Sequence, residues 1–187
     1  MNILILYGTV EGQTAKITEY IANIFNNTGH QVTTRFGEQL PDNFDLENFD
    51  AAIIGSSIHM GDYPKYIEEF VSTHSDWLNS VPSAFFTVCM AIHSQREQSR
   101  EAAKHFGKDF VARTGWQPEL NVTFAGAVKY TQYNFVTRFI MKLISKREGG
   151  STDTSRNHEY TDWEVVARFA KKFATKIEGK EKINRDD

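Results

Sequence analysis

The chain has 187 residues, 40% of them hydrophobic and 24% charged, a composition typical of one globular domain that can bury a core. Its formal net charge of −3 gives no global attraction for nucleic acid, so we expect no nucleic-acid partner. A single cysteine, Cys89, excludes an internal disulfide and a cysteine-based metal site, and no metal is expected. No apolar run approaches the ~20 residues that would span a bilayer.

The first elements expected are a strand over residues 3–6, a loop rich in Gly and Thr, and a helix beginning near residue 12. The first amides of a helix have no partner within it, and its dipole is positive there, so this arrangement forms an anion site. Gly8 and Gly12 let the backbone approach a phosphate, while threonine hydroxyls add donors. The residues expected to bind the phosphate are Thr9, Val10, Glu11, Gly12, Gln13 and Thr14.

The composition of this loop separates it from two other phosphate sites. An ATPase-type P-loop requires Gly-Lys-Ser/Thr, but Gln13 occupies the lysine position, and the glycine spacing does not fit the dinucleotide motif G-x-G-x-x-G. Residues 9–14 instead resemble the flavodoxin phosphate loop T/S-x-T-G-x-T, except at Glu11, which offers only its amide. Because the loop contains no Lys or Arg, we expect amides and hydroxyls to hold a mononucleotide phosphate without a cation.

Strand-like and helical segments alternate along the rest of the chain, which is typical of a parallel α/β sheet. Further strands are expected over residues 31–36, 51–55, 84–90 and 122–128. Capping boxes at Ser94–Glu97 and Thr161–Glu164 predict the starts of two helices. The pattern predicts a flavodoxin-like, doubly wound five-stranded sheet of order 2-1-3-4-5 that binds its ligand beside strands one and three. We expect one domain over residues 1–179 and a charged, frayed tail at 180–187.

Two more loops end at the same edge of the expected sheet, over residues 56–63 and 89–93. In flavodoxins the corresponding loops enclose the isoalloxazine ring and tune its reduction potential. We interpret His59 and His93 as solvated loop histidines, and Cys89 as a small buried hydrophobic residue. No side chain is assigned as a catalytic acid or base. The residues expected to flank the ring are Ser57, Ile58, His59, Cys89, Met90 and Ala91.

An insert of about 30 residues, at 130–160, separates the fifth strand from the last helix, which is long for a connection. Residues 133–147 within it have the periodicity of an amphipathic helix. Its basic ridge consists of Arg138, Lys142 and Lys146, spaced at i, i+4 and i+8. Its expected apolar face consists of Tyr133, Val136, Phe139, Ile140, Leu143 and Ile144.

Three interpretations of this helix remain open from its residues. The helix could pack its apolar face on the domain and leave its cations in water, as most surface helices do. It could lie on a membrane, with the cations at anionic headgroups. It could also form a wall for a large anionic apolar substrate, and this third interpretation is compatible with the second.

The order of several motifs resembles one enzyme family over nearly the whole chain, namely the flavodoxin-type, quinone-dependent protoporphyrinogen IX dehydrogenases of bacterial haem biosynthesis. The insert is the most specific part of this resemblance, because electron-carrier flavodoxins lack it. The motifs are the phosphate loop and the segments at residues 56–58, 79–85, 125–127, 139–146, 149–154 and 160–164.

This resemblance implies FMN as cofactor, protoporphyrinogen IX as electron donor, and menaquinone or ubiquinone as acceptor. It also implies a peripheral position at the cytoplasmic face of the inner (cell) membrane. The flavin supplies the redox chemistry, and the protein positions and tunes it. Arg138, Lys142 and Lys146 would then attract substrate propionates, anionic lipid, or both.

Three other functions on the same fold compete with this one. A flavodoxin electron carrier would usually be more acidic than −3 and would lack a basic insert. An NAD(P)H:quinone reductase would need a nicotinamide site, for which Arg35 is the one weak indication. A flavin-free scaffold would leave the phosphate loop without a purpose.

Overall fold

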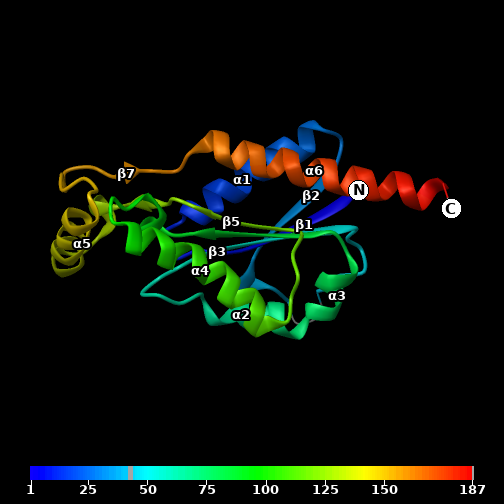
Figure 1. The fold of residues 1–187 in the computed structure, drawn as a ribbon, viewed down its shortest axis with the longest axis horizontal. Coiled ribbons are helices and arrows are strands. Elements are labelled where there is room, and N and C mark those ends of the chain that lie inside the picture. Colours follow the sequence, from blue (N-terminus) through cyan, green and yellow to red (C-terminus); the bar gives the residue numbers. More distant parts are fainter. Residues whose placement is uncertain (42–43, 187) are drawn as a thin grey trace.

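The computed structural model describes residues 1–41 and 44–186 of the chain (Figure 1). The strands are β1 (Asn2–Gly8), β2 (Gln31–Phe36), β3 (Ala51–Ser57), β4 (Ser83–Val88), β5 (Leu120–Phe124), β6 (Ala127–Val128) and β7 (His158–Glu159). The α-helices are α1 (Gln13–Asn27), α2 (Lys65–Thr73), α3 (Ser75–Ser80), α4 (Glu97–Thr114), α5 (Phe135–Glu148) and α6 (Trp163–Asp186). Short 3₁₀ turns are η1 (Gly37–Gln39), η2 (Met90–His93) and η3 (Tyr130–Gln132).

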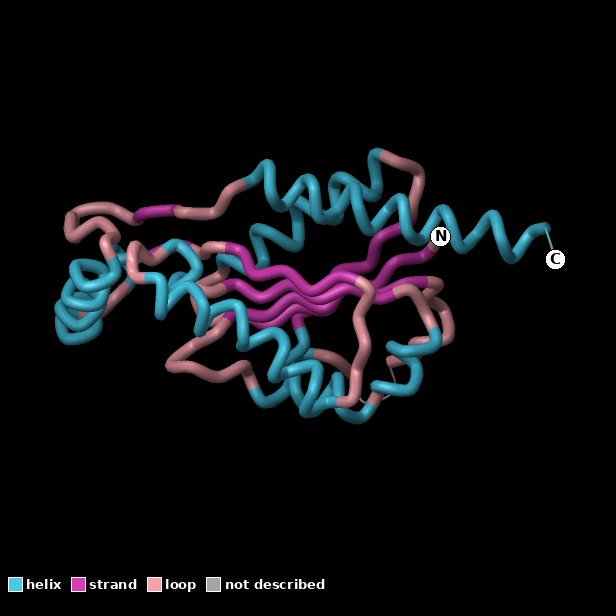
Figure 2. Tube along the Cα trace, in the orientation of Figure 1, coloured by secondary structure: helices cyan, strands magenta, loops and turns pink. Residues whose placement is uncertain are grey.

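Five strands form one parallel sheet in the order β2-β1-β3-β4-β5. Helices α1 and α6 cover one face, and α2, α3 and α4 cover the other (Figures 1 and 2). This arrangement confirms the predicted doubly wound sheet and its strand order. The carboxyl ends of β1, β3 and β4 therefore meet at one edge, where such sheets bind their ligands.

The buried side chains form a separate hydrophobic cluster on each face of the sheet. In β1, Ile3 and Ile5 belong to the cluster under α1 and α6, whereas Leu4 and Leu6 belong to the cluster under α2 and α4. All four are fully buried. Successive side chains of a strand point to opposite faces, so a strand covered on both sides reads as an unbroken apolar run. Burial of each such side chain contributes about 1.5–3 kcal/mol.

The strand expected over residues 122–128 is wrong in its extent. The parallel strand β5 ends at Phe124, and β6 pairs instead with β7 in a small antiparallel ribbon, with Ala127 opposite Glu159. The amide of Tyr160 donates to the carbonyl oxygen of Gly126 at 3.0 Å, which extends this ribbon. The chain therefore leaves the sheet at Ala125 and begins the insert. The strand expected over residues 84–90 likewise ends earlier, at Val88.

Both predicted capping boxes are wrong, because their hydroxyl residues bind tertiary partners. Helix α4 begins at Glu97, and the Ser94 hydroxyl donates to Glu148 of α5 at 2.6 Å. In the second box, the Thr161 hydroxyl donates to the carbonyl oxygen of Ala125 at 2.8 Å. The cap of α6 comes from Asp162, whose carboxylate accepts hydrogen bonds from the amides of residues 164 and 165.

The last helix is longer than the sequence pattern indicates. Helix α6 continues to Asp186 and so includes most of the segment expected to be a tail. Whether that segment frays stays a prediction.

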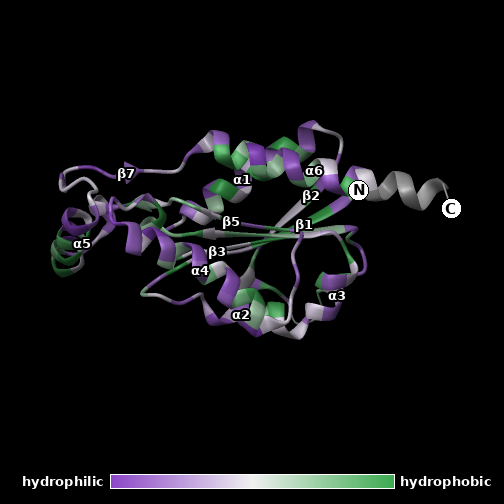
Figure 3. Ribbon diagram, viewed as in Figure 1, coloured by the Kyte–Doolittle hydropathy of each residue, from purple (hydrophilic) through white to green (hydrophobic). Residues whose placement is uncertain are grey.

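Helix α5 lies at one end of the molecule, beyond the carboxyl edge of the sheet (Figure 1). It begins two residues later than expected, because the Asn134 side chain caps it by accepting from the Thr137 amide at 2.9 Å. Its apolar side chains are exposed, contrary to the interpretation in which they pack on the domain, and Figure 3 colours part of this helix as hydrophobic. The exposed fractions are Phe135 84%, Val136 64%, Phe139 57%, Ile140 50%, Leu143 52% and Ile144 46%.

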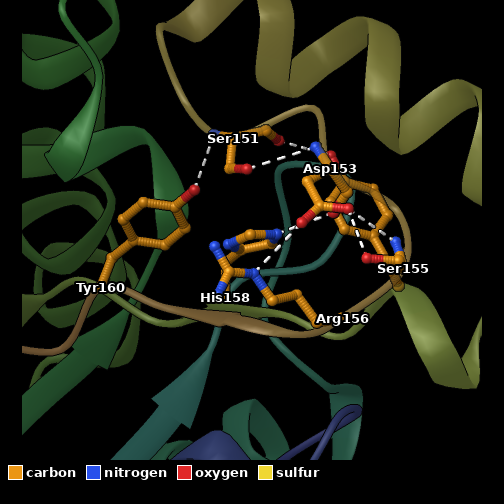
Figure 4. A network of polar contacts seen from close by, with 7 residues as sticks. Ser151, Asp153, Ser155, Arg156, His158 and Tyr160 are labelled. Atoms are coloured by element: carbon orange, nitrogen blue, oxygen red, sulfur yellow. Dashed lines mark hydrogen bonds and ion pairs between the residues drawn. The ribbon is translucent and has the colours of Figure 1, made fainter.

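A polar network fixes the segment that returns from α5 to α6 (Figure 4). The Asp153 carboxylate accepts from the amide and hydroxyl of Ser155 and from Arg156. The Ser155 hydrogen bonds and the nearby Arg156 lower the pKa of this carboxyl. Ser151 is held at the start of the segment, because its amide donates to the Tyr160 hydroxyl at 2.8 Å. These hydrogen bonds therefore fold residues 151–160 back on themselves.

Candidate functional site

A cavity of about 250 Å³ opens at the carboxyl edge of the sheet, between the phosphate loop, the loops after β3 and β4, and α5. Nine of the residues expected at the site line it, which brings together three loops that are far apart in the sequence. These nine are Thr9, Val10, Glu11, Gln13, Thr14, Ser57, Ile58, His59 and Met90. The other lining residues are Met60, Val88, Gly126, Ala127, Met141 and Ile144.

The phosphate loop turns sharply into α1 at Gly12. This residue adopts a left-handed conformation, with φ at 81°, that a residue with a side chain rarely takes. The Thr9 hydroxyl accepts from the Gly12 amide at 2.8 Å and so fixes the turn. The amides of the first turn of α1 follow, and such amides have no partner within a helix. The loop thus presents backbone donors and a positive helix end to an anion.

Two hydroxyl groups at this cavity are buried without a hydrogen-bond partner among the described residues. They are Thr14 Oγ1, on a fully buried side chain, and Ser57 Oγ. A buried polar group without a partner costs about 1–3 kcal/mol, so such groups in a native protein are usually satisfied by a ligand or water. The hydroxyls and the helix end together fit a phosphate group and the polar edge of a flavin.

A lysine that directly precedes the insert lies against the phosphate loop. Lys129 Nζ is 3.4 Å from the point where a Cβ would lie on Gly12. Among the described residues no carboxylate forms an ion pair with this half-buried ammonium. Lys129 does not line the cavity, so the expectation of a phosphate held without a cation stays a prediction, with this ammonium near the loop as the observation against it.

The insert is also joined to the phosphate loop and to α1 by hydrogen bonds. The Tyr133 hydroxyl donates to Glu11 Oε1 at 2.7 Å, and Gln13 Nε2 donates to the Thr161 hydroxyl at 2.9 Å. One turn further along α1, Lys16 forms an ion pair with Glu159. Burial raises the pKa of Tyr133, and the Glu11 carboxylate raises it further, so this phenol stays protonated and remains a donor.

The loop after β3 supplies the next wall of the cavity. The amide of Ile58 donates to the carbonyl oxygen of Val88 at 2.9 Å, which ties this loop to the end of β4. His59 and Asp62 exchange backbone hydrogen bonds and close a tight turn. Within that turn Met60 has a positive φ of 53° and is 93% exposed, an unusual exposure for a large apolar residue.

Of the three residues predicted in the loop after β4, only one lines this cavity. Met90 lines the cavity, whereas Cys89 does not. Cys89 is buried, in agreement with its interpretation as a small hydrophobic residue, and its expected place beside the ring stays a prediction. Burial raises the pKa of the Cys89 thiol, so this group stays neutral. Ala91 lines a neighbouring cavity instead of the first.

The three cations of the predicted ridge have different environments. Arg138 is half-buried, and its guanidinium donates to the carbonyl oxygens of Tyr130 at 3.0 Å and Tyr133 at 2.9 Å. It therefore holds the insert together. Lys142 and Lys146 are exposed on α5 and line neither cavity.

Sequence reasoning missed Lys129 and the two residues of α5, Met141 and Ile144, that line the cavity. The helical period did place Ile144 on an apolar face, and only the tertiary structure shows that one side of this face borders the cavity. Among the described residues, no helix combines the length and apolar character needed to cross a membrane.

Comparisons with known proteins place the chain in a family. A family model described as a flavodoxin domain matches residues 4–155. The protoporphyrinogen IX dehydrogenase [quinone] of Escherichia coli K12 is 36% identical over 174 residues, covering 93% of this chain and 95% of that protein. The chain belongs to the family of quinone-dependent protoporphyrinogen IX dehydrogenases. A Leishmania major protein of the same name is 30% identical over 91% of this chain and 74% of its own length.

Solved structures agree on the fold of this family member. Oxidised flavodoxin 1 from Bacillus cereus superposes with a TM-score of 0.57 at 15% identity, covering 94% of this chain and 98% of that chain. A short-chain flavodoxin associated with a bacterial microcompartment gives a TM-score of 0.56 at 13% identity, covering 95% of this chain and 99% of that chain. The flavodoxin-like fold is therefore confirmed. Membership of the flavodoxin-domain family identifies the chain as a flavoprotein and an oxidoreductase.

Proposed function

We propose that this protein binds FMN and oxidises protoporphyrinogen IX to protoporphyrin IX, with menaquinone or ubiquinone as electron acceptor, in haem biosynthesis. One observation carries the proposal beyond family membership: the insert is built into the site. Met141 and Ile144 of α5 line the same cavity as the phosphate loop, and Tyr133 is hydrogen-bonded to Glu11 of that loop. A plain electron carrier has no need of such a wall over its flavin.

The residues of the cavity have separate roles in this proposal. The amides of residues 12–14, with the Thr14 hydroxyl, hold the FMN phosphate, and Ile58 and Met90 flank the ring. Bound FMN supplies the two-electron chemistry. Apolar side chains from three sides exclude water and lower the local dielectric, which affects the reduction potential. No lining side chain is needed as a base, because the porphyrinogen N–H protons can leave to water or to the quinone.

The exposed apolar face of α5 is explained by a peripheral membrane contact at the cytoplasmic face of the inner membrane. Phe139 and Leu143 are about half exposed and belong to a face of six exposed apolar side chains on α5. An apolar face formed by so many residues is otherwise unfavourable in water. Lys142 and Lys146 are exposed on the same helix, where they can approach anionic headgroups. Respiratory quinones dissolve in the bilayer, so this contact would also bring the protein to its electron acceptor.

An anaerobic assay tests this function. FMN-loaded protein is mixed with protoporphyrinogen IX and a soluble quinone, and porphyrin fluorescence is followed. We expect fluorescence that requires both protein and quinone. Absence of porphyrin with fully loaded protein would refute the proposal, and rapid quinone reduction by NADPH instead would favour the NAD(P)H:quinone reductase.

A further inference from the structure

A second cavity of about 300 Å³ lies beside the first, between α4, η2 and α5. Met90, Met141 and Ile144 line both cavities and so form a wall that the two share. A ligand in the second cavity would lie against the other side of the residues that border the proposed flavin site. Nothing in the flavin-binding role described above makes use of this second space.

The second cavity is mostly apolar. Ala91, Ala102, Phe106 and Val128 form much of its lining, together with the shared methionines and isoleucine. Cavities of roughly 300–1,000 Å³ with such a lining take small organic molecules, and this one lies at the low end of that range. The size suits a ligand of one or two fused rings, and a macrocycle of four pyrroles is too large for it.

The charges around this cavity favour a neutral ligand. Of the described residues that line it, none is Lys or Arg, and one, Glu148, carries a carboxylate. Hydrogen bonds from Ser94 and Ser99 lower the pKa of Glu148, which keeps this group ionised at neutral pH. Arg96 and Arg147 lie 3.8 Å from the carboxylate but do not line the cavity. Propionate groups therefore find no cation here.

The cavity also has a hydrogen-bond donor at its rim and an apolar exit. His93 lines it and is exposed, with its ring against Tyr160 at a centroid distance of 4.6 Å, and its imidazole can donate to a carbonyl oxygen. Ile144 lines the cavity and also belongs to the exposed apolar face of α5. A ligand ring in the cavity could therefore carry an apolar tail that leaves along α5.

From these observations we propose that the second cavity binds the ring of the quinone, with the ring next to Met90 and Met141 and its tail along the apolar face of α5. This inference rests on the proposed function, because it assigns a place to the electron acceptor of that reaction. It places the acceptor alone, and it gives the neutral quinone a space separate from the cavity that holds the proposed flavin.

The test uses FMN-loaded protein and menadione, a naphthoquinone without a tail. Ala102, exposed at the mouth of the cavity, and Ser99, half-buried one turn earlier on α4, both line it, so Ala102→Trp and Ser99→Leu add bulk to its lining; Ser99→Leu also removes a hydrogen bond to Glu148. Ala112→Trp is the matched control, because Ala112 is exposed on α4 and lines neither cavity. Equilibrium dialysis gives the Kd of menadione, fluorescence titration gives the Kd of FMN, and the assay above gives the KM for each substrate.

We expect both cavity variants to raise the Kd and the KM of menadione at least tenfold and to leave the FMN Kd and the porphyrinogen KM unchanged. The control should match the wild type in all four values. Wild-type menadione affinity in both variants would overturn the inference, as would a parallel loss of FMN affinity, which would assign the cavity to the flavin. If the wild type forms no porphyrin with any quinone, the proposed function itself fails.

Discussion

The Tyr133 hydroxyl donates a hydrogen bond of 2.7 Å to the carboxylate of Glu11, and this bond joins the insert to the phosphate loop across 122 positions of sequence. The backbone amide of Lys129 donates to the same hydroxyl at 3.2 Å. The two contacts hold the start of the insert over the loop, with the Lys129 ammonium beside Gly12. The insert therefore contributes directly to the site that the phosphate loop begins.

Lys129→Gln should weaken FMN binding roughly tenfold, because a hydrogen bond to a charged group contributes about 1.5–3 kcal/mol. The affinity for riboflavin, which lacks the phosphate, should not change. Flavin fluorescence titrations at low and high salt measure both affinities, and Lys142→Gln, an exposed lysine of α5, is the control. An equal loss of affinity for both flavins would show that Lys129 supports the fold of the loop and not the phosphate.

Thr14→Val should weaken FMN binding by about tenfold and, at the same time, stabilise the flavin-free protein by about 1 kcal/mol. The variant removes a buried hydroxyl that has no protein partner, and such a group is costly until a ligand satisfies it. Urea unfolding of the flavin-free protein and FMN titration measure the two effects. Opposite signs for stability and affinity are the expected result.

Thr18→Val is a matched control for this prediction. Thr18 lies one turn further along α1, is also fully buried, and also lacks a partner among the described residues, but it does not line the cavity. It should stabilise the flavin-free protein without affecting FMN affinity. A loss of stability in Thr14→Val with unchanged FMN binding would show that its hydroxyl does not face the phosphate.

The sheet and the phosphate loop could be predicted because their signals are local. The apolar run of β1 fills both faces of the sheet, and the loop motif shapes its own turn through Thr9 and Gly12. Strand ends were less predictable, because β5 and β6 follow each other closely in sequence, and only the structure shows that β5 pairs with β4 in the parallel sheet while β6 pairs with β7 in an antiparallel ribbon. A capping residue is also ambiguous when a distant group competes for its hydroxyl, as Glu148 does for Ser94.

The position of Lys129 near Gly12 could not be predicted, because it depends on how the chain folds back after β6. The apolar face of α5 shows a different limit. Helical periodicity identified Phe139, Ile140 and Leu143 as one face, but it carries no information on what covers that face. In the structure it is the more polar side of α5, with Ser145 buried, that packs on the domain.

Ser94→Ala should lower the free energy of unfolding at pH 7 by about 1–2 kcal/mol, since its hydroxyl donates to the ionised Glu148. The hydrogen bond lowers the pKa of Glu148 in the folded state below its ordinary value of 4.5. The stabilisation is therefore fully present above pH 4.5 and is lost as the pH falls through the lower, folded pKa. Urea unfolding of both proteins between pH 3 and 7 measures the difference, which should shrink with acidification. A difference that is constant with pH would point instead to the hydrogen bond that the same hydroxyl accepts from the Arg96 amide at 2.9 Å, which does not titrate.

Two double variants test the proposed membrane contact of α5. Lys142→Glu with Lys146→Glu should weaken binding to anionic vesicles at low salt by roughly 100- to 1,000-fold, because each cation near the surface contributes about 1 kcal/mol and each reversal adds repulsion. Phe139→Asp with Leu143→Asp should weaken binding to both anionic and neutral vesicles, because it removes the apolar anchor. Co-sedimentation measures both. Arg138 is left unchanged, since its guanidinium holds backbone carbonyls of the insert.

The control for the charge reversal is Lys171→Glu with Lys172→Glu, which makes the same change on exposed positions of α6. The charge reversal on α5 and its α6 control should both keep the wild-type KM for porphyrinogen in lipid-free assays with a soluble quinone. The reason is that Lys142 and Lys146 line neither cavity. A raised KM in the α5 variant alone would instead give these lysines a role in binding the propionates. Equal vesicle binding by all variants would mean that the lysines and the apolar face of α5 are solvated and that another surface meets the membrane.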